Sequence, residues 1–67
     1  MKRITYERKR RGWSQAELAR RAGVHTTSMS RIESGQEPPY PRRAARLAAA
    51  LGWDGDPLAL FDDMGVS

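Results

Sequence analysis

Residues 14–34, SQAELARRAGVHTTSMSRIES, carry the pattern of two short amphipathic helices joined by a tight turn. Ser14 and Glu17 have the spacing of a capping box, in which each side chain accepts the other residue's backbone N–H, so a helix is predicted to begin at Gln15. The apolar residues of this helix recur at helical spacing and form one stripe: Leu18, Ala19 and Ala22. Gly23 is predicted to end the helix, because glycine readily takes the left-handed backbone conformation that a sharp turn requires.

The second predicted helix has an apolar inner face and a polar outer face. With His25 as the N-terminal cap, Val24 and Met29 take the positions of a hydrophobic staple. Five residues form the outer face: Thr26, Thr27, Ser28, Ser30 and Arg31. Because this face is short, polar and uncluttered, it suits a helix that enters the major groove of DNA and meets base edges.

Several positions in and beyond residues 10–35 match one known family. Within the run they are Ser14–Gln15, Leu18–Ala19, Gly23, Ile32–Glu33 and Gly35, followed by Pro38 and residues 47–48, 50–52 and 58–61. The chain resembles the lambdoid phage repressor and Cro family, also called the xenobiotic-response-element (XRE) family of bacterial regulators. The resemblance covers about residues 3–62 and implies a compact, all-α, five-helix DNA-binding domain with a central helix-turn-helix at residues 14–34. His25 stands where the family usually has Ser or Thr, and Glu7 and Lys9 leave the first helix little apolar character.

The chain is short and basic, which bounds both its fold and its partners. A chain of 67 residues buries only about 60% of its unfolded surface, so we expect a single domain, residues 1–67, with one small core. No cysteine is present to form a disulfide or a cysteine-based zinc site. The formal net charge of +4 favours a polyanionic partner. Residues 1–34 hold nine Lys or Arg against three acids, whereas residues 35–67 hold three against five, so the helix-turn-helix lies in the basic half.

Neither a secretory signal nor a membrane span is expected. The charged start MKR precedes no apolar segment, and no apolar run approaches the roughly 20 residues that a membrane span requires. We therefore expect a cytoplasmic protein, and the resemblance implies a bacterial or phage-encoded one associated with the nucleoid.

The basic run at residues 8–11 has two interpretations. A charge run without structural context is usually a solvated helix face. Beside a helix-turn-helix, the same run favours contact with phosphates that flank the groove, and such contacts supply most of the sequence-independent affinity. We expect DNA backbone contacts from eight residues: Arg10, Arg11, Gln15, His25, Ser30, Gln36, Arg42 and Arg43. Of these, Gln15 resembles the family glutamine that braces the recognition helix against DNA.

Four residues of the second helix are expected to contact bases: Thr26, Thr27, Ser28 and Arg31. Arg31 can donate two hydrogen bonds to guanine O6 and N7, and Thr27 offers a methyl group to thymine. The alternative for Arg31 is a contact with phosphate alone. By resemblance, Arg8 and Glu33 match the positions of a partly buried salt bridge between the first helix and the end of the recognition helix. The alternative for Arg8 is one more phosphate contact.

The remaining segments predict a scaffold and an interface. A first helix is predicted at residues 3–11, a fourth from Pro41 to Gly52, and a short fifth from Asp56-Pro57. The C-terminal third holds more apolar residues than one short helix can bury, and members of the resembled family dimerise in this region. Residues 52–64 are therefore expected to form a dimer interface through Trp53, Leu58, Leu60, Phe61 and Met64.

Catalytic and metal-binding chemistry is not expected. His25 is the only histidine and the eight carboxylates are scattered, so the sequence offers no metal site and no general base for its serines. Without a glycine-rich phosphate loop, no cofactor and no small-molecule ligand are expected. The chain is interpreted as a transcriptional regulator and not an enzyme: a repressor that binds a palindromic operator in double-stranded DNA as a homodimer. Two alternatives share the fold, the antitoxin of a toxin–antitoxin pair and a protein-bridging coactivator.

Overall fold

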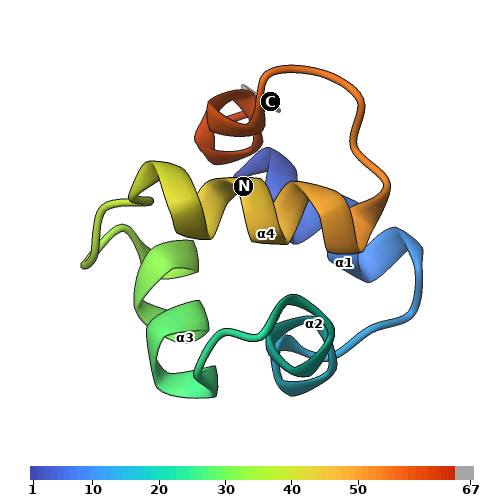
Figure 1. Cartoon of the computed structure of the whole chain (residues 1–67), viewed down its shortest axis with the longest axis vertical. Coiled ribbons are helices and arrows are strands. Elements are labelled where there is room, and N and C mark those ends of the chain that lie inside the picture. The colour runs from blue at the N-terminus through green and yellow to red at the C-terminus, as the bar shows by residue number, and fades with distance from the viewer. Residues whose placement is uncertain (65–67) are drawn as a thin grey trace.

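The computed structural model describes residues 1–64 of the chain (Figure 1). Within that range it has four α-helices, one 3-10 helix and no strand: α1 (Arg3–Arg10), α2 (Gln15–Ala22), α3 (Thr26–Ser34), α4 (Pro41–Leu51) and η1 (Pro57–Phe61). The all-α fold is therefore confirmed. Residues 65–67 of the expected domain lie outside the described residues.

The expectation of a fifth α-helix is wrong, because η1 is a 3-10 helix of five residues. Its start is as predicted: the Asp56 carboxylate accepts the Leu58 N–H at 3.0 Å, and Pro57 occupies the first helical position. The backbone is already extended at Asp62, which ends the segment after five residues. Helical segments this short commonly take the tighter 3-10 form.

The two ends of α2 are set by the residues that the sequence singles out. Ser14 Oγ accepts the Glu17 N–H at 3.0 Å, which is one half of the predicted capping box. The other half, a hydrogen bond from the Ser14 N–H to the Glu17 side chain, is missing. The Glu17 carboxylate instead pairs with Arg20 and Arg21, one turn further along α2. Gly23 closes α2 in the left-handed conformation, with φ at 71°. This conformation lets the chain reverse towards α3.

The core draws on every element of the chain. Figure 1 shows α4 crossing the middle of the molecule, with η1 on one side and α2 and α3 on the other. Each element contributes at least one large, fully buried side chain: Ile4, Leu18, Met29, Ile32, Leu47 and Leu60. Leu60 is therefore a core residue and not the interface residue expected, because its side chain has no surface exposed to a second copy.

Charged side chains complete the packing of α1. Glu7 is only 5% exposed. Its carboxylate pairs with three arginines, Arg11 at 2.8 Å and Arg10 at 3.2 Å at the end of α1 and Arg3 at 3.9 Å at its start. Arg11 also donates to the carbonyl oxygen of Leu51, the last residue of α4. An ion-pair network thus ties α1 to α4 where apolar residues are few.

The two ends of the described chain lie side by side, a feature that the sequence analysis did not predict. Lys2 and Asp63 form an isolated antiparallel bridge. Beside it, the Arg3 N–H donates to the Asp62 carbonyl oxygen at 3.0 Å. These contacts hold the beginning of α1 against the end of η1.

Replacing Glu7 with alanine is expected to lower the free energy of unfolding by about 1–3 kcal/mol, because three arginines lose their shared acceptor at a buried position. The matched control is Glu17→Ala, which removes a glutamate paired with two arginines on the more exposed surface of α2. Its effect should be much smaller, since surface ion pairs contribute little. Urea unfolding followed by circular dichroism measures both variants. Equal losses would contradict the structural role of Glu7.

Candidate nucleic-acid interface

The outer face of α3 is free, while its inner face is fixed in the core. Met29 and Ile32 are buried, and Val24 packs against the same core as the predicted staple requires. The polar residues Thr26, Thr27, Ser30 and Arg31 are exposed. Ser28, which was expected on this face, is partly buried. The helix therefore presents four of the five expected polar side chains to the outside.

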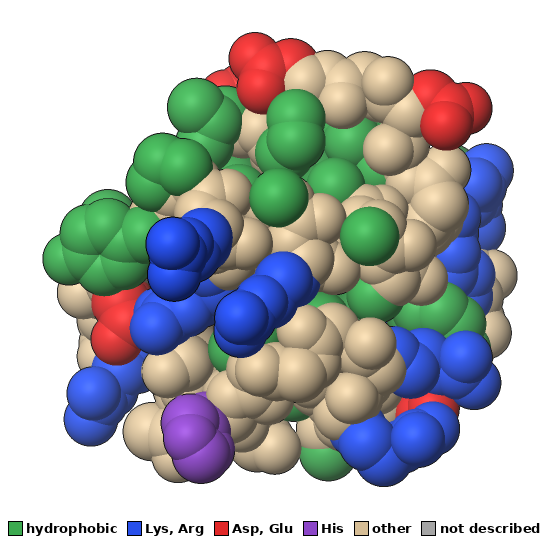
Figure 2. All heavy atoms as spheres, viewed as in Figure 1, with side chains coloured by type: hydrophobic (Ala, Val, Ile, Leu, Met, Phe, Trp, Pro, Cys, Tyr) green, Lys and Arg blue, Asp and Glu red, His purple; other side chains and the backbone are tan. Residues whose placement is uncertain are grey.

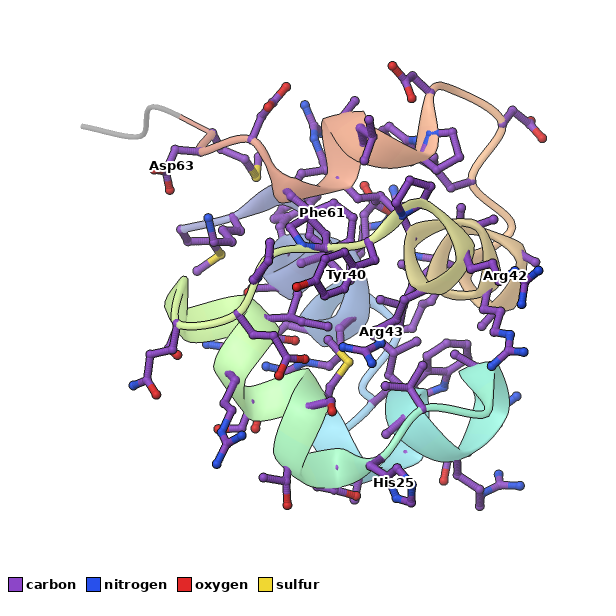
Figure 3. All side chains as sticks on the ribbon, turned by 60° about the vertical axis from the view of Figure 1, so that its left-hand side comes forward. His25, Tyr40, Arg42, Arg43, Phe61 and Asp63 are labelled. Carbon is purple, nitrogen blue, oxygen red and sulfur yellow. The ribbon has the colours of Figure 1, made fainter. Side chains whose placement is uncertain are left out.

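The amino end of α3 forms a tip of the molecule. His25 occupies the N-cap position, but its side chain makes no capping hydrogen bond. Its backbone oxygen accepts the Met29 N–H at 3.0 Å and so begins the helix. Figure 3 shows the imidazole at the lower end of the molecule, away from α4 and far from Asp63. The ring is exposed at the point where a helix inserted into a groove would enter first.

Glu33, near the end of α3, joins three helices through its carboxylate. Arg8 of α1 contacts it with two nitrogens, Nε to Oε2 at 2.8 Å and Nη2 to Oε1 at 3.0 Å. Oε1 also accepts hydrogen bonds from Thr5 Oγ1 and from Gln15 Nε2, each at 3.1 Å. The remaining nitrogen of Arg8, Nη1, donates to the Trp13 carbonyl oxygen at 2.8 Å. The salt bridge that the resemblance implies is therefore present, and it extends to α2 and to the α1–α2 turn.

The surroundings of Glu33 keep it ionised. Its side chain is 6% exposed and that of Arg8 is 10% exposed. Burial acts to raise the pKa of the Glu33 carboxyl, but the hydrogen bonds from Arg8, Gln15 and Thr5 and the charge of Arg8 together bring the pKa below its ordinary value of 4.5. A lowered folded-state pKa stabilises the fold above that ordinary value. The stabilisation is lost as the pH falls from about 4.5 through the folded-state pKa.

Gln15, the first residue of α2, is oriented by the same carboxylate. Its amide nitrogen donates one hydrogen to Glu33 Oε1. An amide NH2 group has two donors, so one further N–H remains for another acceptor. The end of α2 that faces α3 thus carries a donor whose direction is set by the protein.

Besides His25 and Gln15, six residues were expected on the DNA backbone, and they fall into two groups. Acids of the chain hold three of the arginines: Arg10 and Arg11 pair with Glu7, and Arg43 pairs with Glu37. Three other residues are exposed: Ser30 on α3, Gln36 in the loop between α3 and α4, and Arg42 on α4. Gln15 and Ser30 line one surface hollow between α1, α2 and α3. Arg42 instead projects outward from α4 (Figure 3).

Lys2, Thr5 and Lys9 line the same hollow, and the sequence analysis did not select them. Their spacing of i, i+3 and i+7 places them on one face of α1. Helical periodicity applied to the polar residues of the first helix would have grouped them. Counting the charges of the basic run does not show which of its members share a face.

The C-terminal third presents a small apolar surface among acids. Leu58 is 49% exposed, whereas Trp53, Phe61 and Met64 are partly buried. The Trp53 indole N–H donates to the Asp56 carbonyl oxygen at 3.0 Å. The exposed acids of this third are Asp54, Asp56, Asp62 and Asp63. Figure 2 shows acidic side chains along the upper edge and most Lys and Arg across the middle and lower part of that face.

A polar-faced helix that packs on a preceding helix across a glycine turn, in a basic half of the chain, defines a DNA-binding helix-turn-helix domain. The comparison with known families agrees with this class: the model of a helix-turn-helix domain matches residues 6–61. The chain belongs to this helix-turn-helix domain family. No curated protein and no solved structure matched the chain.

Two further observations bound the described part of the chain. No helix in residues 1–64 has the length and apolar character needed to cross a membrane. In the same residues, no group of three or more His, Cys, Asp or Glu side chains is arranged to hold a metal ion.

Glu33→Gln is expected to cost about 2–3 kcal/mol of stability at neutral pH, because Arg8 is left buried without its counter-charge. The lowered pKa of Glu33 also predicts a change in the response to acid. Below about pH 4.5, the stability of the wild type should fall more steeply than that of the variant, which has no carboxyl to protonate at this position.

The matched control is Glu37→Gln. Glu37 also pairs with an arginine, Arg43, but both side chains are more exposed than Arg8 and Glu33. This variant should stay close to the wild type in stability and keep its acid response. Urea unfolding at a series of pH values measures all three proteins. Parallel curves for wild type and Glu33→Gln below pH 4.5 would rule out the proposed linkage.

Proposed function

We propose that this chain is a sequence-specific transcriptional regulator that places α3 in the major groove of operator DNA. The observation that carries the proposal is the exposed polar face of α3 on a helix whose opposite face is fixed by Met29 and Ile32. A helix held in this way aligns several donors with base edges at once, which is the requirement for direct readout. The basic half of the chain adds attraction to the phosphate backbone.

Within this class, the chain is proposed to be a repressor of the lambdoid, XRE type. The Arg8–Glu33 ion pair supports this assignment, since the resemblance implied it at these two positions. The order of helices around a central α2–α3 pair also agrees with it. A domain bound to its operator excludes other proteins from the same DNA, which is the simplest form of repression.

Base reading is assigned to Thr26, Thr27 and Arg31. Thr27 and Arg31 are four residues apart and therefore lie on one stripe of α3. Arg31 is exposed and has no carboxylate partner within residues 1–64. Its guanidinium group is thus free to make a two-pronged contact with guanine. Ser28 is the weakest of the four expected readers, because it is partly buried.

The operator is proposed to be a palindrome bound by a homodimer. The exposed Leu58 supplies apolar surface in the C-terminal third for the contact between copies. The partly buried Phe61 and Met64, three and six residues further on, add to it. A two-fold dimer of this kind would present two α3 helices roughly 34 Å apart, one turn of DNA. The aspartates of this third would approach their equivalents across the two-fold axis. Like-charge repulsion then makes the dimer weak at low salt.

Selection from a pool of random duplex oligonucleotides tests this function directly. A regulator of this type should enrich one short motif, and a two-fold dimer should enrich it as an inverted repeat. A single half-site would support sequence reading and reject the dimer. Failure to enrich any duplex would reject the proposed function and favour the protein-bridging alternative.

Arg31→Ala is expected to relax base preference at one symmetric pair of operator positions, losing about 1–3 kcal/mol of discrimination there. The slope of affinity against salt concentration should hardly change, because no phosphate contact is removed. Titration of wild type and variant against operators mutated at each position, at two salt concentrations, gives both quantities. A uniform loss over all operators, with a slope reduced by roughly 1, would assign Arg31 to a phosphate instead.

Self-association is expected to strengthen as salt concentration rises, because salt screens the repulsion between the aspartates of the two copies. DNA binding should show the opposite dependence. Sedimentation equilibrium at low and high salt measures the association, with Leu58→Asp as the disrupting variant. Tyr6→Ser, which removes an exposed aromatic residue of α1, is the control. A strict monomer at every concentration and salt would reject the homodimer.

A further inference from the structure

The four residues of the basic run, residues 8–11, have different partners in the structure. Arg8 is bound to Glu33 and to the Trp13 carbonyl oxygen. Arg10 and Arg11 pair with Glu7. Among the described residues, Lys9 is the one member of the run that no carboxylate holds, and its side chain is exposed. Lys9 therefore carries the one charge of the run that has no acid beside it within residues 1–64, whereas Arg10 and Arg11 share the single charge of Glu7.

Lys9 lies at a surface hollow of about 450 Å³ between α1, the start of α2 and the side of α3. The residues around it that bear on its chemistry are Lys2, Lys9, Gln15, Ser30 and Ser34. The Arg8–Glu33 ion pair also lines it. Because the Glu33 side chain is only 6% exposed and its oxygens accept four hydrogen bonds, this carboxylate offers little negative charge to the opening.

The groups that remain are donors and cations, which is the chemistry of an anion site. No acid of residues 1–64 pairs with the Lys9 ammonium group, and Lys2 gives one of its three donors to the Phe61 carbonyl oxygen. Gln15 has a second amide N–H beyond the one bound to Glu33. Ser30 is exposed and adds a hydroxyl group from α3. Lys9, Gln15 and Ser30 thus line the hollow from three different helices, and Lys2 adds a second cation to its lining.

The position of the hollow on α3 indicates which anion it meets. Ser30 and Ser34 are one helical turn apart and line the hollow, whereas Thr27 and Arg31 lie on the neighbouring stripe. If that neighbouring stripe faces base edges, the hollow faces the sugar-phosphate backbone at the edge of the same groove. Backbone contacts of this kind fix the register of a recognition helix.

We propose that this hollow seats one phosphate of the operator backbone and that Lys9 makes the main contact. The proposal rests on the DNA-binding function above and deepens it. It assigns the phosphate contact of the basic run to Lys9. Arg10 and Arg11, which were expected to make that contact, pair with Glu7 instead. Glu33 acts in the same site as a positioning residue, because it accepts a hydrogen bond from the amide of Gln15, which lines the hollow.

The first test compares the salt dependence of DNA affinity in the wild type and four variants. Lys9→Ala should reduce the slope of log affinity against log salt by about 0.9 and weaken binding to all sequences alike. Arg10→Ala should change the slope less, because Arg10 pairs with Glu7 and does not line the hollow. Arg46→Ala is the matched control, since Arg46 is exposed on α4 and lies away from the hollow. Lys9→Arg should restore the wild-type slope.

The second test locates the phosphate. Operators in which single phosphates are replaced by neutral methylphosphonates are titrated with wild type and with Lys9→Ala. One position in each half-site should weaken the wild type severalfold and leave Lys9→Ala unaffected, because the charge pair is already missing. Thermal melts of Lys9→Ala should match the wild type, as expected for an exposed side chain.

The outcomes separate this proposal from the function on which it rests. Salt-dependent DNA binding by the wild type, with an unchanged slope in Lys9→Ala, overturns the phosphate seat and leaves the function standing. A slope reduced in Arg10→Ala but not in Lys9→Ala returns the contact to the arginine and overturns the proposal in the same way. Absence of DNA binding by the wild type overturns both.

Discussion

The carboxylate of Glu33 fixes the relative positions of the three helices that carry the interface. Four hydrogen bonds reach it, from α1 through Arg8 and Thr5 and from α2 through Gln15. α3 has nine residues, and an isolated helix of that length is marginal in water. Buried Met29 and Ile32 set how close α3 lies to the core. Glu33 sets its rotation and ties its far end to α1, so the exposed face has one orientation and not several.

The sequence predicted what depends on near neighbours in the chain. Ser14 caps α2 and Gly23 ends it because each acts on groups within about one helical turn, and Asp56-Pro57 starts η1 for the same reason. Glu7 could not be assigned in this way. In a helix with little apolar character it reads as a surface acid, yet it is buried, because arginines on the same helix and the end of α4 surround it. Leu60 was misassigned for a related reason. A surplus of apolar residues predicts that they are buried, but not whether they pack against their own chain or against a second copy.

The number of basic residues in the interface also does not show where each positive charge lies. A run of four basic residues suggests four phosphate contacts, but an arginine that is bound to a buried acid has its position fixed by the fold. Arg8, Arg10 and Arg11 each have such a partner. Arginine suits these roles, because its planar group makes several hydrogen bonds at once, whereas lysine is a flexible point charge. In this run, the single lysine is the residue that has no acid partner within residues 1–64.

A core that takes one or more large side chains from every element leaves no part of the chain able to fold alone. Leu60 of η1 packs in the same cluster as Met29 and Ile32 of α3, although about 30 residues separate them in sequence. Unfolding of such a small domain is expected to be cooperative, with no populated intermediate. The DNA-facing surface is then present in full or absent altogether. Its population in solution equals the population of the whole native state, so a change in η1 large enough to unfold the domain also removes the DNA-facing surface of α3.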